Sequence, residues 1–320
     1  MAEAGSGAAP VFERLCVIGL GLIGASVALA ARRGGRVGRV VAYDASAAVR
    51  ARVAELGLAD AVAESAAAAV HDADHVLLCV PVGAIGAVMA EIAPHLAPGA
   101  IVSDVGSVKG SVVEAVTPHL PEGVAFVPAH PVAGTEFSGP DAGFAALFEN
   151  RWCILTPCPA STDAAVARAR ALWESFGAIV DTMTPAHHDL VLAITSHVPH
   201  LIAYNIVGTA ADLETVTNSE VIKFSAGGFR DFTRIAASDP TMWRDVFLNN
   251  REAVLEMLGR FLEDLSALQR MVRFGDGDGL FDLFTKTRAI RRSIVALGQE
   301  TAAADFGRRD GTPGEVSGGS

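Results

Sequence analysis

Hydrophobic residues in the first half of the chain gather in short runs that alternate with segments of helical character. Continuous apolar runs of this length are typical of strands in a parallel sheet that helices cover on both faces. The predicted strands are Leu15–Gly19, Val40–Tyr43, His75–Val80, Ala100–Asp104, Val124–Val127 and Cys153–Thr156, and Ala45–Leu56 and Gly83–Ala93 are two of the predicted helices. We therefore expect an α/β N-terminal domain with a mostly parallel, doubly wound sheet.

The strand pattern stops after about residue 182, and the remaining apolar positions repeat with helical spacing. The predicted helices are Pro185–Leu213, Pro240–Val272 and Leu280–Leu297. The second begins with Asp239 as N-cap and Pro240 in the first helical position, and it is apolar on more than one side. Such a helix cannot bury its faces within a small domain, so we expect an all-α C-terminal domain that dimerises with a second copy of the chain.

Two changes in composition define the expected domain boundaries. Residues 1–11 are rich in alanine, glycine and serine, and residues 303–320 are polar and rich in glycine, so both are predicted to be disordered tails. Between them we expect a nucleotide-binding domain over residues 12–182 and a helical substrate and dimerisation domain over residues 183–302.

Charge and composition narrow the classes of partner. The chain has 320 residues and a formal net charge of -11, which disfavours nucleic acid as a partner because phosphates would be repelled. The uncharged stretch Leu15–Ala31 is shorter than a membrane span of ~20 residues and is interrupted by glycines. The four cysteines lack C-x-x-C spacing and are expected to be reduced thiols. We expect a cytoplasmic protein without a membrane partner.

A glycine-rich motif follows the first predicted strand and opens a helix. In Gly19-Leu20-Gly21-Leu22-Ile23-Gly24, Gly19 permits a tight turn, Gly21 lets the backbone approach a pyrophosphate, and Gly24 allows close packing of helix on strand. The motif alone also fits an ordinary glycine-rich turn. Its context is that of a Rossmann domain, because Asp44 ends the next strand, where a carboxylate accepts the ribose hydroxyls and repels a 2′-phosphate. We therefore predict a site for NAD rather than NADP.

Two further polar clusters follow predicted strands, where a parallel sheet forms its ligand crevice. Ser103–Lys109 contains Ser107, which could be a helix N-cap or reach a catalytic group. His130–Glu136 begins with a histidine that could be a general base or simply hydrogen-bonded in a loop.

A third cluster lies in the helical half, where Ser196, His197 and His200 fall within two helical turns interrupted by Pro199. These side chains either line a site or are satisfied groups of the core. No H-E-x-x-H spacing or carboxylate accompanies them, so we expect no metal. Downstream, Arg230 and Arg234 could bind a carboxylate or form surface ion pairs.

Taken in order, these motifs resemble the prephenate/arogenate (cyclohexadienyl) dehydrogenase family. The resemblance extends over about residues 13–300, and the segments HPVAGTE, SHVPH and TRIAASDPTMWRD carry it. It implies an NAD-dependent oxidative decarboxylation that makes tyrosine precursors. Hydride leaves the ring carbon that bears the 4-hydroxyl, carbon dioxide leaves the opposite ring position, and aromatisation drives the reaction.

The resemblance also implies roles for individual residues. His130 would accept the hydrogen bond or proton of the 4-hydroxyl, and Ser107 would orient His130 and touch the nicotinamide. Ser196, His197 and His200 would face the substrate, and Arg234 would hold a substrate carboxylate. The residues expected to contact the cofactor are Gly19, Gly21, Leu22, Ile23, Gly24, Asp44 and Ser107. A homodimer with interlocked helical domains is implied as well.

Two alternatives remain open at this point. One is a β-hydroxyacid dehydrogenase or imine reductase, which also pairs a Rossmann domain with a helical domain but usually carries lysine or aspartate on the helix between them. The other is an NAD-binding redox sensor without catalysis, which would have little use for both His130 and Arg234. The motifs do not distinguish prephenate from arogenate as the substrate.

Overall fold

The computed structural model describes residues 9–135, 137–212 and 225–296. Most of both predicted tails, Glu136 of the HPVAGTE segment and the predicted helix ends Leu213 and Leu297 lie outside the described residues. The chain forms two compact units, one up to Gly259 and one from Arg260 onward.

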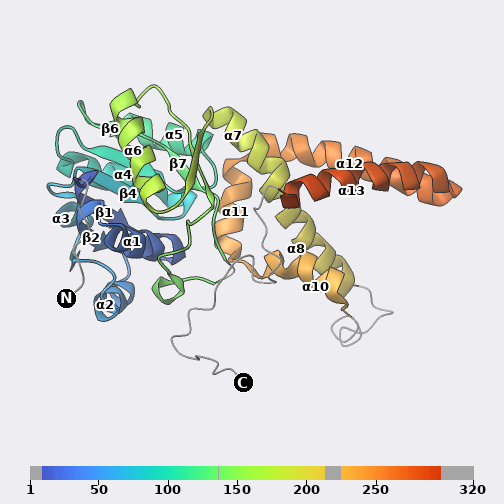
Figure 1. Cartoon of the computed structure of the whole chain (residues 1–320), viewed down its shortest axis with the longest axis horizontal. Coiled ribbons are helices and arrows are strands. Elements are labelled where there is room, and N and C mark those ends of the chain that lie inside the picture. The colour runs from blue at the N-terminus through green and yellow to red at the C-terminus, as the bar shows by residue number, and fades with distance from the viewer. Residues whose placement is uncertain (1–8, 136, 213–224, 297–320) are drawn as a thin grey trace, which may run out of the picture. The chain divides into compact units, whose positions relative to one another are not determined.

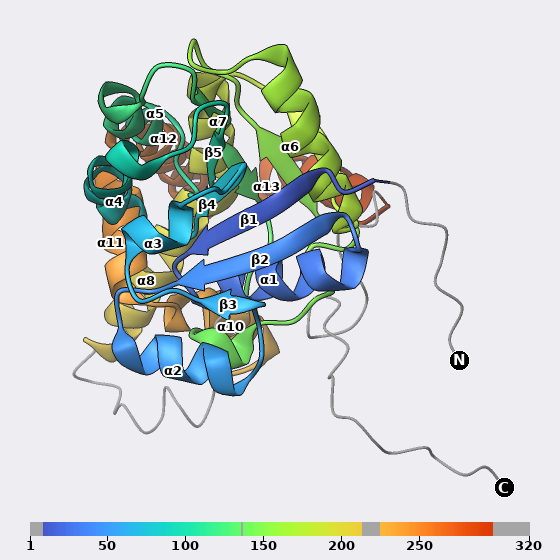
Figure 2. The same cartoon turned by 90° about the vertical axis from the view of Figure 1, so that its left-hand side faces the viewer.

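A six-stranded parallel sheet with the order β3-β2-β1-β4-β5-β6 forms the centre of the N-terminal part (Figures 1 and 2). Its strands are β1 (Phe12–Ile18), β2 (Val37–Tyr43), β3 (Ala61–Val62), β4 (His75–Leu78), β5 (Ile101–Asp104) and β6 (Ala125–Phe126). The predicted doubly wound sheet is confirmed. The sequence pattern missed β3 because two residues at the sheet edge make no apolar run.

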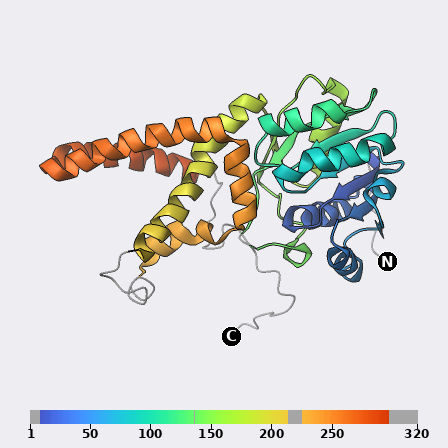
Figure 3. The same cartoon turned by 180° about the vertical axis from the view of Figure 1, so that it is seen from behind.

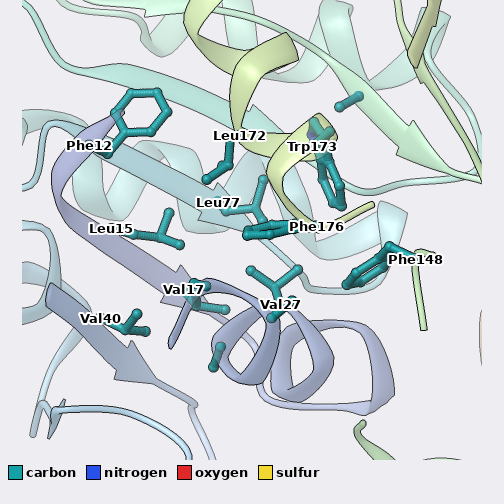
Figure 4. Close-up of a cluster of buried hydrophobic side chains, with 14 of the residues drawn as sticks. Phe12, Leu15, Val17, Val27, Val40, Leu77, Phe148, Leu172, Trp173 and Phe176 are labelled. Carbon is teal, nitrogen blue, oxygen red and sulfur yellow. The ribbon is translucent and has the colours of Figure 1, made fainter. Parts of the chain in front are cut away.

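Helices cover both faces of this sheet. They must do so because successive apolar side chains of β1 point to opposite faces. Leu15 and Val17 point into one core with α1 (Leu22–Gly34) and α6 (Asp163–Ser175), as Figure 4 shows. Their neighbours Cys16 and Ile18 belong to a second core. That core is completed by α3 (Ala66–Val70), α4 (Ile85–Ile92) and α5 (Gly110–Val116), while α2 (Ala47–Glu55) follows β2. Burial on both sides explains why the strands are uniformly apolar.

A second, three-stranded sheet follows along the chain and contains the predicted base. Strand β7 (Ala129–Pro131) pairs antiparallel with β8 (Trp152–Leu155), which pairs parallel with β9 (Ile179–Thr182). His130, expected directly after a predicted strand, lies within strand β7 opposite Ile154. Strand pairing with β8 therefore holds its backbone, a more rigid support than a loop gives.

The helical part begins with α7 (Pro185–Leu192), a wide π turn (Ala193–His197) and α8 (Val198–Ala211). It continues with α10 (Gly227–Thr233), α11 (Pro240–Asn249), α12 (Arg251–Phe274) and α13 (Gly277–Ala296). By length and composition alone, Pro185–Ala211 could cross a membrane. It carries the buried polar residues His188, Asp189 and His197, however, and Asp189 bonds to the α/β part.

The predicted single helix from Pro240 to Val272 is wrong, because the chain bends at Asn250. Asn250 closes α11 with φ -111° and ψ 35°, and its side-chain amide donates to the Asp189 carbonyl oxygen at 2.8 Å. These tertiary contacts are invisible in the apolar pattern, which continues unbroken through the bend. Within the second unit, the end of α12 and α13 are joined by a turn at Gly275, where φ is +68° (Figure 3).

Candidate active site

The glycine motif joins β1 to α1 in a turn that has room only for glycine at two positions. Gly19 has a φ of +93°, and a Cβ there would lie 2.5 Å from the Cys79 carbonyl oxygen. At Gly24 it would lie 1.9 Å from the Gly19 carbonyl oxygen. At Gly21, by contrast, a Cβ would meet no atom within 4 Å, and α1 begins there without a side-chain cap. Open space at an uncapped helix N-terminus suits a pyrophosphate.

Asp44, directly after β2, is hydrogen-bonded to the same turn. Its carboxylate accepts from the Leu20 N–H and the Ser46 N–H, each at 2.9 Å. An arginine that the sequence reasoning overlooked also lies beside it. Arg50 donates to the Asp44 carbonyl oxygen at 2.8 Å, and its guanidinium lies 5.6 Å from the centre of the Tyr43 ring. The acid is therefore both a candidate ribose ligand and a support for the turn.

His130 is the first member of a hydrogen-bonded chain of side chains. Its Nδ1 lies 2.8 Å from Nε2 of His188, and Nδ1 of His188 lies 2.9 Å from Oδ1 of Asp189. His188 and Asp189 are adjacent on α7, and all three residues are buried. Within the described part of the chain, no hydrogen bond engages Nε2 of His130. This nitrogen is thus available to a ligand.

The environment of His130 keeps its imidazole neutral. Burial lowers the pKa of His130 well below 6.5, and the nearby His188, Lys109 and His197 act in the same direction. Burial also lowers the pKa of His188, against the opposing effect of Asp189. A neutral imidazole carries a proton on only one ring nitrogen, so the other nitrogen can accept a proton, as a general base requires.

Asp189 also connects the helical half to the nucleotide-binding half. Its two carboxylate oxygens accept from the backbone N–H groups of Lys109 and Gly110, each at 2.8 Å, at the start of α5. Burial alone would raise its pKa, but the hydrogen bonds from His188 and from these backbone groups hold the pKa of Asp189 below its usual value. Asp189 is therefore an ionised cap on a helix that lacks one of its own.

This cap bears on the role expected of Ser107. Lys109 is the N-cap residue of α5 and makes no side-chain cap bond, so Ser107 is not the helix cap that its position allowed. In this structure the hydrogen-bond partner of His130 Nδ1 is His188 and not Ser107, which was expected to orient the ring. Ser107 is half-buried in the loop after β5, and a backbone group of Ser107 lies beside His197. Its contact with the nicotinamide stays a prediction.

The three polar residues of the helical half lie in different surroundings. His197 is fully buried, with Nδ1 3.0 Å from the Asn250 amide and its ring edge against Trp243. His200 is half-buried, stacks on Trp243 at 3.6 Å, and donates from Nδ1 to the Ser196 carbonyl oxygen at 2.8 Å. Burial lowers the pKa of each histidine to about 4. His200 is thus the better placed of the two to touch a ligand.

Arg234 opens a short helical turn, Arg234–Ala237, close to His200. It is half-buried, and its charge contributes to the lowered pKa of His200. The hydroxyl of Tyr204 on α8 donates to the Ser238 carbonyl oxygen at 2.7 Å, which holds the end of this turn against the helix. The structure therefore places Arg234 near His200.

Sequence reasoning missed His188 and Asp189, although a signal for them exists. Both are polar residues in a predicted apolar helix, and this criterion singled out Ser196, His197 and His200 farther along the chain. The helix start at Gly110 gave no further signal, because Ser107 just before it could have served as the cap. That signal could not name the partner, because His130 and His188 are 58 residues apart.

The fold and the site define a two-domain dehydrogenase with a Rossmann-type nucleotide-binding half. The family model described as the nucleotide-binding domain of prephenate dehydrogenase matches residues 27–182. The model described as the prephenate dehydrogenase dimerization domain matches residues 184–286. The chain belongs to the prephenate dehydrogenase family, so the predicted family is confirmed.

Relatives and solved structures agree with this assignment. A cyclohexadienyl dehydrogenase of Zymomonas mobilis is 43% identical over 89% of this chain and 97% of the relative. A prephenate dehydrogenase of Bacillus subtilis is 34% identical over 92% of this chain and 79% of the relative. The crystal structure of Aquifex aeolicus prephenate dehydrogenase with hydroxyphenyl propionate and NAD+ has a TM-score of 0.82 at 32% identity, covering 88% of this chain and 98% of that one. Arogenate dehydrogenase of Synechocystis has a TM-score of 0.74 at 27% identity, covering 88% and 99%.

Proposed function

We propose that the protein catalyses the NAD-dependent oxidative decarboxylation of prephenate, arogenate or both, in tyrosine biosynthesis. Family membership and the names of its relatives support the reaction class. The observation that carries the proposal within this chain is the buried, neutral His130, whose Nε2 is left available by the Asp189–His188–His130 chain. We propose that the enzyme works in the cytoplasm on this small-molecule substrate, without nucleic acid or membrane.

The glycine turn and Asp44 fit a dinucleotide. The open space at Gly21 and the uncapped start of α1 at Leu22 and Ile23 suit the pyrophosphate, and Asp44 suits the ribose hydroxyls. The relative from Aquifex aeolicus, with NAD+ in its crystal structure, supports NAD as the cofactor. NAD, when bound, accepts the hydride at its nicotinamide ring.

The remaining steps fall to side chains of this protein. Nε2 of His130 accepts the proton of the 4-hydroxyl while the C–H bond at that carbon breaks. The bond to the leaving carboxylate then breaks, its electron pair enters the ring, and carbon dioxide departs. The ring becomes aromatic, and the proton returns from His130 to the phenolate oxygen. The substrate's remaining carboxylate would be held by Arg234 and His200, whose positions bring a cation and a polar ring together.

One assay tests the proposed function. Purified protein is supplied with prephenate or arogenate and with NAD or NADP, and formation of reduced nicotinamide is followed by absorbance. We expect turnover with at least one substrate and NAD. A β-hydroxyacid serves as the control substrate. Turnover of the β-hydroxyacid instead of both cyclohexadienyl substrates would contradict the proposal, and so would nucleotide binding without turnover, which would indicate a sensor.

Asp44→Ser should reduce the preference for NAD over NADP. The substitution removes the charge that would repel a 2′-phosphate and leaves the cationic Arg50 beside the site. Because the carboxylate also holds the Leu20 N–H, we expect weaker NAD binding as well. The measurement is kcat/KM with each nucleotide. Asp60→Ser is the control, since Asp60 accepts from the Val40 N–H at 2.7 Å in the same sheet but does not follow the glycine turn. Unchanged nucleotide selectivity in Asp44→Ser would remove Asp44 from the cofactor site.

Arg234→Lys should raise KM for the substrate and leave kcat near the wild-type value. A lysine keeps the charge but loses the two parallel hydrogen bonds of a guanidinium, which are worth ~1.5–3 kcal/mol, so KM should rise by roughly 10- to 100-fold. Arg230→Lys, an exposed arginine on α10, is the matched control. A collapse of kcat at constant KM would show that Arg234 acts in the chemistry rather than in binding.

The protein should be a homodimer through its helical half. The matching dimerization-domain model supports this, and large apolar side chains of the second unit are exposed. Examples are Val272 at 62%, Phe274 at 78% and Phe281 at 71%. Light scattering should give twice the chain mass of 33.1 kDa. Phe281→Glu should weaken the dimer, whereas Asp282→Asn beside it should not. A stable, active wild-type monomer would refute the proposal.

A further inference from the structure

We propose that His188 and Asp189 are positioning residues that hold His130 in the tautomer with Nδ1 protonated and Nε2 ready to accept a proton. This inference rests on the proposed role of His130 as the base. It assigns a task to two residues that neither touch the glycine turn nor belong to the Ser196–His200 segment.

The order of hydrogen bonds determines the tautomer. An ionised carboxylate can only accept, so Oδ1 of Asp189 requires a proton on Nδ1 of His188. At neutral pH the ring of His188 carries a single proton, which leaves its Nε2 as an acceptor. Nδ1 of His130, 2.8 Å away, must then be the donor. The remaining nitrogen of His130, Nε2, therefore holds a lone pair.

Asp189, the first member of the Asp189–His188–His130 hydrogen-bond chain, is held firmly in place. Oδ1 of Asp189 also accepts from the Lys109 N–H, Oδ2 accepts from the Gly110 N–H, and the backbone carbonyl of Asp189 accepts from Asn250. A Cβ at Gly110 would lie 3.0 Å from Oδ2, so the carboxylate sits directly against the backbone. With both oxygens engaged, the carboxylate cannot rotate away from His188, and the orientation of His188 follows.

The Asp189–His188–His130 hydrogen-bond chain also stabilises the positive charge on His130 that burial disfavours. Burial opposes a positive charge on His130, yet the ring must take up a proton as hydride leaves the substrate. The charge that then develops is shared through His188 with the carboxylate of Asp189, at no cost of reorganisation because the groups are already aligned. The proton that reaches Nε2 comes from the substrate hydroxyl and later returns to the phenolate oxygen. Over one reaction cycle the three side chains therefore have no net gain or loss of protons.

Three secondary-structure elements contribute to the Asp189–His188–His130 hydrogen-bond chain. Their contacts couple the helical half of the protein to the base. His130 lies on β7, His188 and Asp189 lie on α7, and the backbone groups that bind Asp189 open α5. Docking α7 on α5 therefore aligns His188 with His130. The base is complete only when both halves are in place.

The first test substitutes His188. His188→Phe removes the acceptor for Nδ1 of His130, and we expect kcat to fall by roughly 10- to 100-fold, the usual cost of losing an orienting partner. The KM for substrate and the Kd for NAD should stay within about twofold, since neither site is touched. His188→Gln, which can place an amide oxygen near Nδ1 of His130, should recover part of kcat. His187→Phe is the matched control, because His187 is the adjacent, exposed histidine on α7.

A spectroscopic measurement decides the tautomer independently of activity. In ¹⁵N-histidine-labelled wild-type enzyme, His130 should show a protonated Nδ1 and an unprotonated Nε2, and His188→Phe should lose this pattern while His187→Phe keeps it. Asp189→Asn preserves size and one acceptor oxygen but removes the charge, so kcat should fall without a matching rise in KM. Asp189→Asn therefore still tests the positioning role if His188→Phe does not fold.

The outcomes separate the two proposals. Wild-type kcat in both His188→Phe and Asp189→Asn, or a protonated Nε2 on His130 in the wild type, would overturn the positioning role. A wild-type enzyme that reduces NAD with neither prephenate nor arogenate would overturn the proposed function, while the ¹⁵N signals would still report whether the chain sets the tautomer of His130.

Discussion

His130→Asn is expected to lower kcat by roughly 10²- to 10⁴-fold, the range found for loss of a general base, with little change in KM. Asparagine keeps some hydrogen-bonding capacity but cannot take up the hydroxyl proton. The substrate carboxylate would still be held by Arg234, and the glycine turn would still hold NAD, so binding should persist. Steady-state kinetics and a separate titration of NAD binding make the comparison.

The pH dependence of kcat gives a second signature of His130. The base works only when it is neutral, so activity should fall as the pH drops through the pKa of His130 in the bound enzyme. Because burial lowers this pKa well below 6.5, the acidic limb should lie below the range of an ordinary histidine. The limb should be absent in His130→Asn.

His95→Asn is a matched control, because this exposed histidine ends the helical turn Ala93–His95 that follows α4. It should leave kcat and the acidic limb unchanged. A His130→Asn enzyme with wild-type turnover would place the base elsewhere, and His200 would be the next candidate because it is less buried than His197.

Lys109→Met is expected to destabilise the protein by ~3–5 kcal/mol, the cost of leaving a buried charge without its partner. Lys109 and Asp104 are both fully buried and form an ion pair at the end of β5. Lys109 also donates to the Ala129 carbonyl oxygen at 2.7 Å, one residue before His130. Methionine fills a similar volume, so the loss should come from the charge of Asp104 and the unpaired carbonyl rather than from a cavity.

Chemical denaturation at a constant protein concentration measures this loss, since dimerisation would add to apparent stability. The double variant Lys109→Met/Asp104→Asn should recover much of it, because the amide oxygen still accepts from the Gly106 N–H while the buried charge is gone. A loss below about 1 kcal/mol in Lys109→Met would contradict the assignment.

Local patterns were sufficient for most of the apolar strands and for the nucleotide turn. Strands buried on both faces require continuous apolar runs, so β1, β2, β4, β5, β6 and β8 could be read along the chain. The turn at Gly19–Gly24 depends on contacts within a few residues or with the adjacent strand, where a Cβ at Gly19 or Gly24 would collide. Asp44 could be placed because its distance from the glycines is set by one helix and one strand.

The surroundings of each catalytic candidate were decided only by the tertiary structure. His130 could be named from its motif, but its partner His188 lies on a helix far along the chain, and the cap of α5 comes from the same helix. The break at Asn250 likewise follows from its bonds to Asp189 and His197, which no helical periodicity records. A sequence states which side chains can donate, accept or be buried. Which of them meet depends on how β7, α5 and α7 pack, and packing joins residues that local patterns treat as independent.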